Sequence, residues 1–370
     1  MKTGIRTEIS FFCRSHIKPV IFFIGFFTIA AFFLLSASCF GIQQKNSHKE
    51  ITLTLASYVP AGYPYLYAGQ KIFVDLVNKR GKGVVQLNSY FSGTLLKGNL
   101  LLPGLQAGTT DLIFQTGAYL LGSYPIIGIQ MLPVWKTVSE SYKALKMGTP
   151  LYELQNQVLG EKNLFQLANS GLIPEFLWTR KKLVRTPGDM KGLKIRVAGI
   201  VEAKIIQAFG ASPVTMPSAE LPQSLQRGVI DGALINPWTA QGRGIEEFCE
   251  YMLVHPVSWI STPIYIMRDR WDSLSESVKR MLLDCASEWE IRYMSFPGIG
   301  IVNEEQLSNE VIPAYESRGM KAVYLTKKEV DAFDNAAKPV IKWWVKRVGE
   351  KIGNTALKYT GKSAAYAVQP

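Results

Sequence analysis

The sequence predicts an α/β fold built on parallel sheets, and the clearest evidence lies between residues 192 and 238. Residues 193–197 and 229–236 are short apolar runs that are typical of strands, and the residues after the first run repeat with helical spacing. A third strand at 214–216 and a helix that opens at Ser218 complete an alternation of strands and helices. Because strands joined through helices pair in parallel with right-handed crossovers, this segment predicts a parallel sheet.

A second observation indicates two lobes of similar design. The segment from Gln106 to Asp111 parallels the segment from Gln226 to Asp231, and in both a glycine ends a helix shortly before a strand. A chain of 370 residues can bury two cores, and its hydrophobic content of 47% is that of an ordinary globular protein. We therefore expect two α/β lobes.

Local patterns predict the remaining elements in chain order. The alternating run 51–56 begins the fold as a strand, and Gly81 ends a helix over 65–80. The capping box from Thr326 to Glu329 starts the last main helix, which Pro339 should kink. The other expected strands lie at 84–88, 111–114, 164–168, 262–267 and 322–325, and the other expected helices lie at 98–105, between 133 and 164, at 278–289 and at 299–318.

Two polar residues end the strands of the central segment. Arg196 lies near the end of the first strand and Asn236 at the end of the last one. In an open parallel sheet, ligands bind in the crevice outside the carboxyl ends of the strands, so both side chains should reach that crevice. The planar donor fork of an arginine matches a carboxylate, and an asparagine offers a donor and an acceptor. An isolated strand-end arginine is more commonly solvated, and Asn236 before Pro237 is also a good helix cap.

Three motifs around these residues carry a family resemblance. Residues 189–197 (DMKGLKIRV), 210–213 (GASP) and 231–237 (DGALINP) resemble the solute receptors of tripartite ATP-independent periplasmic (TRAP) transporters, the DctP-type family. The resemblance implies a two-lobed periplasmic-binding-protein fold in which each lobe is a mainly parallel sheet flanked by helices and the ligand cleft lies between the lobes. It also implies that Arg196 pairs with the solute carboxylate and that Asn236 lines the same cleft.

Local composition and the resemblance together imply a division of the chain. Composition predicts an export signal or membrane anchor at 1–38 and a tether at 39–50. The resemblance implies a first lobe at 51–172 plus 257–325, a second lobe at 173–256, and a C-terminal helix and tail at 326–370 that pack across the lobes.

Four further residues are candidate contacts to the solute. The family often has a second arginine about twenty residues before the first, and counting back from Arg196 reaches Phe176 instead. Phe176 and Trp178 would make the pocket more apolar, which favours a monocarboxylate with an apolar or keto-bearing body. Trp238 could stack on the solute or fill the lobe interior. Tyr58 follows the first strand, where a cleft wall should be, although tyrosines there are also ordinary packing residues.

The N-terminus has the pattern of an export signal. A basic region to Lys18 precedes the apolar run 19–35, the small residues 36–38 and Cys39. Cys39 could carry a lipid, but Ser36 stands where a lipoprotein signal prefers a large aliphatic residue, so cleavage beside Cys39 or an uncleaved anchor are equal alternatives. Lipid attachment or the uncleaved anchor would each associate the protein with a membrane.

Composition and motifs exclude several classes of function. The net charge is +12, and without residues 1–38 it is +9, but no basic run or nucleic-acid motif accompanies it, so no nucleic-acid partner is expected. The sequence has no G-x-S-x-G, H-E-x-x-H, phosphate loop or C-x-x-C, which argues against an enzyme, a catalytic residue or a metal site. Cys249 and Cys285 could form a disulfide, but two buried thiols are the commoner case.

We expect, from the resemblance, an exported receptor that captures a small organic carboxylate and delivers it to TRAP-type membrane permease subunits, with no cofactor. Two alternatives stay open on the sequence alone: an exported enzyme acting on a small acid, and a ligand-binding partner of a sensor.

Overall fold

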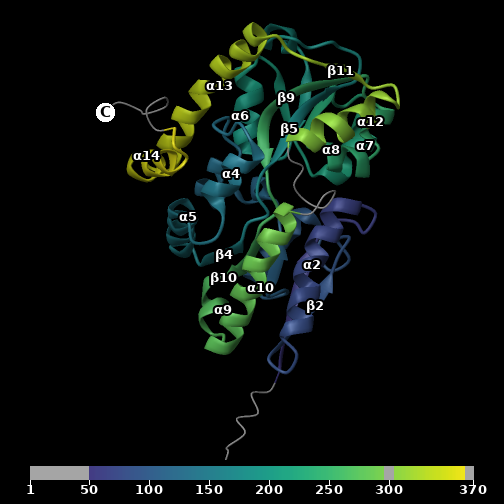
Figure 1. Cartoon of the computed structure of the whole chain (residues 1–370). Coiled ribbons are helices and arrows are strands. Elements are labelled where there is room, and N and C mark those ends of the chain that lie inside the picture. The colour runs from purple at the N-terminus through teal and green to yellow at the C-terminus, as the bar shows by residue number, and fades with distance from the viewer. Residues whose placement is uncertain (1–49, 296–303, 363–370) are drawn as a thin grey trace, which may run out of the picture. The chain divides into compact units, whose positions relative to one another are not determined.

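The computed structural model describes residues 50–295 and 304–362 of the chain (Figure 1). The expected export signal at 1–38, Cys39 and nearly all of the expected tether lie outside the described residues. In the described part, no helix is long and apolar enough to cross a membrane.

The first sheet collects strands from distant parts of the chain. Its order is β2-β1-β3-β10-β4, where β1 is parallel to β2 and β3, and β10 is antiparallel to β3 and β4. The rings of Phe73, Phe114 and Trp289 pack together at centroid distances of 5.6–6.2 Å, so helices α2 and α10 cover a face of this sheet (Figure 1). The strands are β1 (Ile51–Ser57), β2 (Val85–Tyr90), β3 (Leu112–Phe114), β4 (Leu164–Ala168) and β10 (Ile264–Met267), and the two helices are α2 (Pro64–Arg80) and α10 (Glu276–Ser295).

The second sheet contains the segment that carries the family motifs. Its order is β11-β9-β5-β8-β6-β7, and the predicted alternation is confirmed: β6 is parallel to both β7 and β8, with α6 and α7 in the connections. β5 is antiparallel to β8 and β9, so both sheets are mixed. The elements are β5 (Ile173–Thr179), β6 (Lys194–Val197), α6 (Ile200–Ala208), β7 (Ser212–Thr215), α7 (Leu221–Gln226), β8 (Gly232–Ile235), β9 (Tyr251–Ile260) and β11 (Lys321–Val323).

Two of the strand placements differ from the sequence expectation. The strand expected at 322–325 in the first lobe is β11, and it pairs in parallel with β9 of the second sheet. Residues 257–260, also expected in the first lobe, continue β9, whose Ile260 pairs with Ile173. A three-residue strand carries too few side chains to indicate its partner, and a ten-residue strand gives no local signal of where the lobe changes.

The repeated segment serves the same purpose in both lobes. Gly108 and Gly228 have φ values of 73° and 70°, a left-handed conformation that glycine adopts without strain at the end of a helix. The side chain of Asp111 then accepts from Thr54 N at 2.7 Å, and that of Asp231 accepts from Lys194 N at 2.8 Å. Each aspartate thereby fixes its strand beside a parallel neighbour.

The other helical elements lie between these strands or, in the case of α13 and α14, follow the last strand. The capping box predicted at Thr326 is present, and the Thr326 side chain accepts from Glu329 N. α13 continues through Pro339 and packs against α6 and η3. The remaining elements are η1 (Gly98–Leu100), α3 (Leu101–Gln106), η2 (Gly117–Leu120), η3 (Pro125–Gln130), α4 (Val138–Leu145), α5 (Pro150–Gly160), η4 (Pro187–Met190), η5 (Ser218–Glu220), α8 (Pro237–Gly242), η6 (Ile245–Glu247), α9 (Arg268–Asp272), α11 (Glu304–Gln306), the π-helical turn η7 (Leu307–Val311), α12 (Ile312–Glu316), α13 (Lys327–Val348) and α14 (Glu350–Tyr359).

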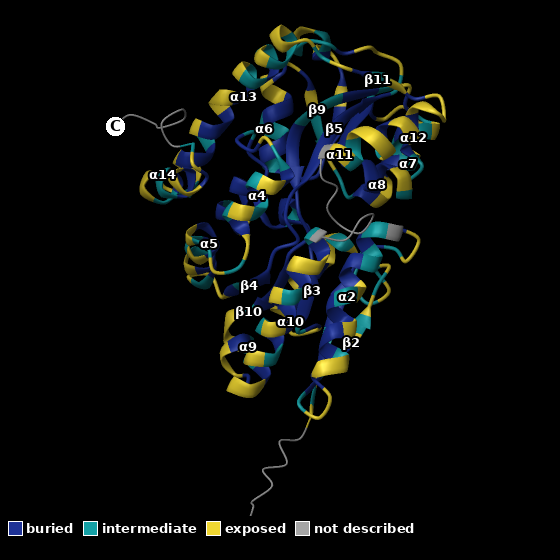
Figure 2. Cartoon of the chain, viewed as in Figure 1, coloured by how far each residue is buried: buried dark blue, intermediate teal, exposed yellow. Residues whose placement is uncertain are grey.

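The chain passes between the two sheets at residues 169–172 and 261–263, and these segments are tied to each other and to α10. Thr262 N donates to Ser170 Oγ at 3.0 Å. Glu290 of α10 is buried, and its carboxyl accepts from Asn169 N at 2.7 Å and from Met147 N at 3.0 Å. Buried residues fill the sheets and the inner sides of their helices, and these crossings lie among them (Figure 2). The crossings are therefore firmly held.

Candidate functional site

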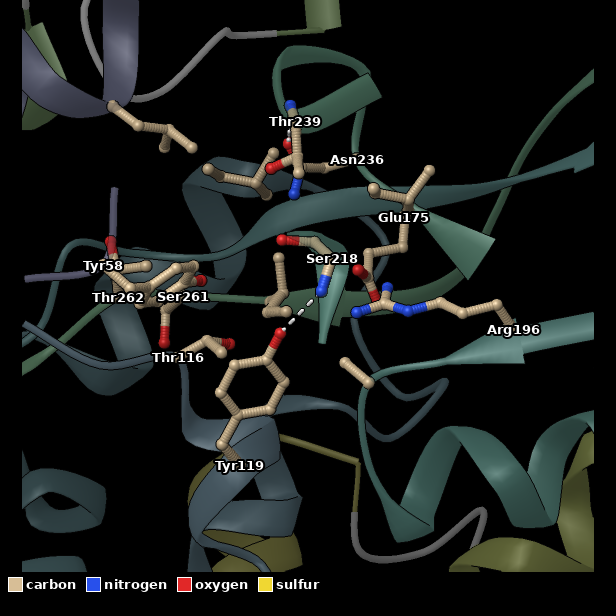
Figure 3. A pocket seen from close by; sticks show the side chains of 15 residues that line it. Tyr58, Thr116, Tyr119, Glu175, Arg196, Ser218, Asn236, Thr239, Ser261 and Thr262 are labelled. Carbon is tan, nitrogen blue, oxygen red and sulfur yellow. Dashed lines mark hydrogen bonds between the residues drawn. The ribbon is translucent and has the colours of Figure 1, made fainter. Parts of the chain in front are cut away.

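A cavity lies where residues of the two sheets face each other, and Arg196 is in its wall (Figure 3). Its volume is about 30 Å³, against roughly 300 Å³ or more for typical ligand pockets, so the walls meet closely. The lining residues are Tyr58, Leu66, Thr116, Tyr119, Ile173, Glu175, Arg196, Ala198, Ser218, Ile235, Asn236, Thr239, Ile260, Ser261 and Thr262.

The guanidinium of Arg196 is oriented by the protein backbone. Arg196 lies on β6 and is 2% exposed. Its Nε donates to the carbonyl of Met216 at 2.9 Å and its Nη1 to the carbonyl of Leu234 at 3.3 Å. These are its only hydrogen bonds to the described residues, and they use two of the five N–H groups of a guanidinium. A buried, oriented arginine with unused donors in a cavity wall can bind an anionic group.

Two buried carboxyl groups accompany Arg196. Glu175 on β5 is 1% exposed and lines the cavity, where its carboxyl points toward the guanidinium (Figure 3). Glu202 near the start of α6 is fully buried, and its Oε2 accepts from Ala198 N and Gly199 N, each at 2.7 Å. Burial, followed by the charge of Glu202 and a hydrogen bond to it, holds the pKa of Glu175 well above its usual value, and the charge of Arg196 opposes this only partly.

Asn236 combines a structural contact with a place in the cavity wall. It lies at the N-terminus of α8, where its Oδ1 accepts from Thr239 N at 2.9 Å. The cap expected from the Asn-Pro sequence is therefore confirmed. Because Asn236 also lines the cavity, its amide N–H₂ is placed to meet a ligand on the Arg196 side.

The opposite wall is contributed by residues of the first sheet and the elements after its strands. Tyr58 follows β1, and its ring packs on that of Tyr119 at a centroid distance of 5.8 Å. Burial is the largest cause that raises the pKa of the Tyr58 hydroxyl well above its usual value, so this group is a neutral hydrogen-bonding group. Ser218 N of η5 donates to the Tyr119 hydroxyl at 3.1 Å across the cavity (Figure 3). This bond joins the two walls directly.

Three predicted contacts lie elsewhere. Phe176 and Trp178 pack in the core of the second sheet, where Trp178 Nε1 donates to the carbonyl of Ile235, and neither lines the cavity. Trp238 is buried in the main core and packs edge-on against Tyr65. The expectation of an apolar wall at Phe176 is therefore wrong: its neighbour Glu175 is the β5 residue that faces Arg196, and a register shift in β5 follows Glu175.

Sequence reasoning missed Glu175, Glu202, Tyr119 and Ser218. Glu202 could have been found, because a glutamate three residues after the N-cap commonly accepts from the N-cap N–H, which is the half of a capping box that Gly199 permits. The position of Glu175 beside Arg196 depends on how β5 pairs with β8 and β9, and no local pattern in the sequence records this pairing. The two thiols that could have formed a disulfide, Cys249 and Cys285, are both free and buried.

Comparison with known proteins places this chain in a family. A family model described as bacterial extracellular solute-binding protein, family 7 (DctP), matches residues 55–347. The chain belongs to the DctP family. The resemblance indicated by the motifs around Arg196 and Asn236 is thereby confirmed.

Individual DctP relatives cover most of the chain. A solute-binding protein of Albidiferax ferrireducens is 23% identical over 72% of this chain and 77% of its own length. The C4-dicarboxylate-binding periplasmic protein DctP of Rhodobacter capsulatus is 24% identical over 76% of this chain and 83% of its own. The crystal structure of DctP7, a Bordetella pertussis extracytoplasmic solute receptor binding pyroglutamic acid, superposes with a TM-score of 0.72 at 21% identity and covers 84% of this chain and 100% of that one. The two-lobed fold expected from the sequence is confirmed by this likeness.

Proposed function

We propose that the protein is the extracytoplasmic receptor of a TRAP-type transporter, which binds a small organic carboxylate and delivers it to membrane permease subunits. The observation that carries the proposal is Arg196, a buried cation that backbone carbonyls hold in the wall of a cavity shared by both sheets. Membership in the DctP family supports it, as do relatives named for binding C4-dicarboxylates and pyroglutamic acid.

Capture follows from the position of the cavity. A solute enters when the two walls separate about the crossings at 169–172 and 261–263, and its carboxylate then pairs with Arg196. Closure brings Tyr58, Tyr119 and Asn236 around the solute and removes water from the site. The closed form is favoured to the extent that the solute binds it more tightly. The permease can then distinguish a loaded receptor from an empty one.

Binding alone accounts for these residues, so we propose a receptor rather than an enzyme. The solute should accordingly be recovered unchanged after incubation with the protein. Mass spectrometry of the recovered solute checks this, and a product that appears in proportion to protein and time would establish the enzyme alternative.

We further propose that residues 1–38 direct export to the periplasm or to the outer face of the cytoplasmic membrane. Attachment there would use either a lipid on Cys39 or the uncleaved segment, and intact-mass measurement of the protein from membranes distinguishes the two. A mature chain that begins after Cys39 and carries no lipid would remove both forms of attachment.

The carboxylate proposal is tested by thermal unfolding of the protein from Gln43 onward in the presence of small carboxylates and of their uncharged amides. A ligand at a hundred times its dissociation constant adds roughly 2.7 kcal/mol to stability, which raises the midpoint measurably. We expect the acids to raise it and the amides to have no effect. Arg196→Lys keeps the positive charge but loses the planar guanidinium donors, so the acids should raise the unfolding midpoint of this variant much less.

Lys194→Ala is the matched control, because Lys194 is an exposed cation on the same strand. It should respond to the acids like the unchanged protein. Equal responses of Arg196→Lys and the control, with both variants folded, would show that Arg196 does not bind the carboxylate.

A further inference from the structure

In the buried pair of Glu175 and Glu202, each carboxyl group has an oxygen to which the proposed receptor function gives no role. Glu175 Oε2 and Glu202 Oε1 are both buried, and neither accepts a hydrogen bond from an N–H group or a hydroxyl of the described residues. Arg196 forms no ion pair with either carboxyl in the described part of the chain, although Glu175 points toward it (Figure 3). A buried polar atom without a partner costs about 1–3 kcal/mol, so the pair must be satisfied in another way.

A proton on Glu175 satisfies both carboxyls. Two backbone N–H groups at the start of α6 donate to Glu202 Oε2, and this contact and the helix dipole stabilise a negative charge on Glu202. Glu175 lacks such donors, and burial and the neighbouring carboxylate raise its pKa well above the usual value. Glu175 is therefore the member that holds a proton, and it donates this proton to Glu202.

This arrangement fixes what Glu175 offers to a ligand. With its proton directed to Glu202, the oxygen left for the cavity is a carbonyl oxygen, which only accepts. The charges that face it are those of Arg196 on β6 and Glu202 on α6, and they balance. A second carboxylate on the solute would meet the negative pair, and a keto oxygen would meet another acceptor. A hydroxyl or N–H group would make a hydrogen bond.

We propose that the solute carries a hydrogen-bond donor, a hydroxyl or an N–H group, close to the carboxylate that Arg196 binds, and that the Glu175 carboxyl accepts from it. This inference rests on the proposed receptor function and narrows its solute class to hydroxy and amino or amido acids. It replaces the keto-bearing or apolar monocarboxylate expected when Phe176 was taken to face the cleft.

The test uses acids that differ only beside the carboxylate. One series is propionate, pyruvate, lactate and alanine, and the other is pentanoate, 2-oxopentanoate, 2-hydroxypentanoate and norvaline. Dissociation constants are measured by calorimetry for the full-length exported protein. We expect the hydroxy or amino member of the better-binding series to bind at least tenfold more tightly than the unsubstituted and keto members. Equal affinities, or tighter binding of the keto acid, would overturn the inference.

Two variants connect the preference to Glu175. Glu175→Leu removes the acceptor, so the ratio between donor-bearing and unsubstituted acids should fall to about one. Glu175→Gln keeps an acceptor oxygen and supplies an N–H for Glu202, so it should retain that ratio. Retention of the full ratio by a folded Glu175→Leu protein would refute the role of Glu175, as would its loss in Glu175→Gln. If the leucine variant does not fold, the acid series and Glu175→Gln decide.

Failure of the receptor proposal and failure of this inference alone give different experimental results. If Arg196→Lys leaves the affinity for every acid unchanged, or if no acid binds, the receptor proposal and this inference both fall. If the acids bind through Arg196 without any preference for a donor, only the inference falls.

Discussion

Replacing Glu290 by glutamine should remove a pH dependence from the stability of this protein. Glu290 lies on α10, and its two carboxyl oxygens accept from Met147 N and from Asn169 N, the latter in a segment that crosses between the sheets. Burial raises the pKa of this carboxyl to about 7, although the two backbone hydrogen bonds act in the opposite direction. The folded protein therefore keeps a proton over a pH range in which the unfolded chain has lost it.

The sign and size of the effect follow from that difference. A group whose pKa is higher in the folded state stabilises the fold below the unfolded pKa, and this contribution is lost as the pH rises through the folded pKa. With values of 4.5 for the unfolded chain and about 7 for the folded protein, the free energy of unfolding should fall by about 2.5 kcal/mol between about pH 5 and about pH 8 through this group alone.

Urea unfolding at these two pH values measures the effect. Glu290→Gln should be less stable overall, because an amide offers one acceptor oxygen to two backbone N–H groups, but its stability should lack this fall of about 2.5 kcal/mol. Glu276→Gln on the same helix is the control, because Glu276 is exposed, and it should keep the pH dependence of the unchanged protein. An equal pH dependence in Glu290→Gln and the unchanged protein would refute the assignment.

Two further predictions concern the walls of the cavity. Asn236→Ala should lower the free energy of unfolding by about 1 kcal/mol, because the cap to Thr239 N is lost, and should also weaken solute binding. Asn236→Asp should keep the cap and weaken only the binding, so urea unfolding and calorimetry separate the two effects. Unchanged affinity in both variants would place Asn236 outside the site. Tyr119→Phe should lose the hydrogen bond from Ser218 N across the cavity, which should weaken solute binding by about 1 kcal/mol while the free energy of unfolding stays nearly unchanged. An unchanged dissociation constant would show that this hydrogen bond does not help closure.

The sequence predicted the part of the site that follows from regular elements. Strands with intervening helices have a defined hand and direction, so the parallel pairing of β6 with β7 and β8 followed from hydrophobic spacing. Arg196 and Asn236 lie at the ends of such strands, and the structure brings both to one cavity with Tyr58. The repeated turn before Asp111 and Asp231 could be recognised because each glycine ends its helix locally, but the long-range bonds of the two aspartates to Thr54 N and Lys194 N could not.

The rest depended on long-range pairing that no local pattern records. In a regular strand, counting positions indicates which side chains share a face, but β5 shifts its register between Glu175 and Leu177 against β9. The family separation of about twenty residues before Arg196 selected Phe176, which packs in the core, whereas Glu175, one residue earlier, lines the cavity. Trp238 was equally ambiguous, because an aromatic ring suits a core as well as a pocket. The partner of β11 was unpredictable because three residues carry no register information.

The most direct test of the central claim is a crystal structure of the protein with the tightest-binding acid from the thermal screen. We expect the carboxylate between the two sheets, with its oxygens roughly 2.7–2.9 Å from guanidinium nitrogens of Arg196 and with Asn236 and Tyr58 around the solute. A solute bound away from this cavity, or bound within it with its carboxylate turned away from Arg196, would contradict the proposal that Arg196 captures the carboxylate.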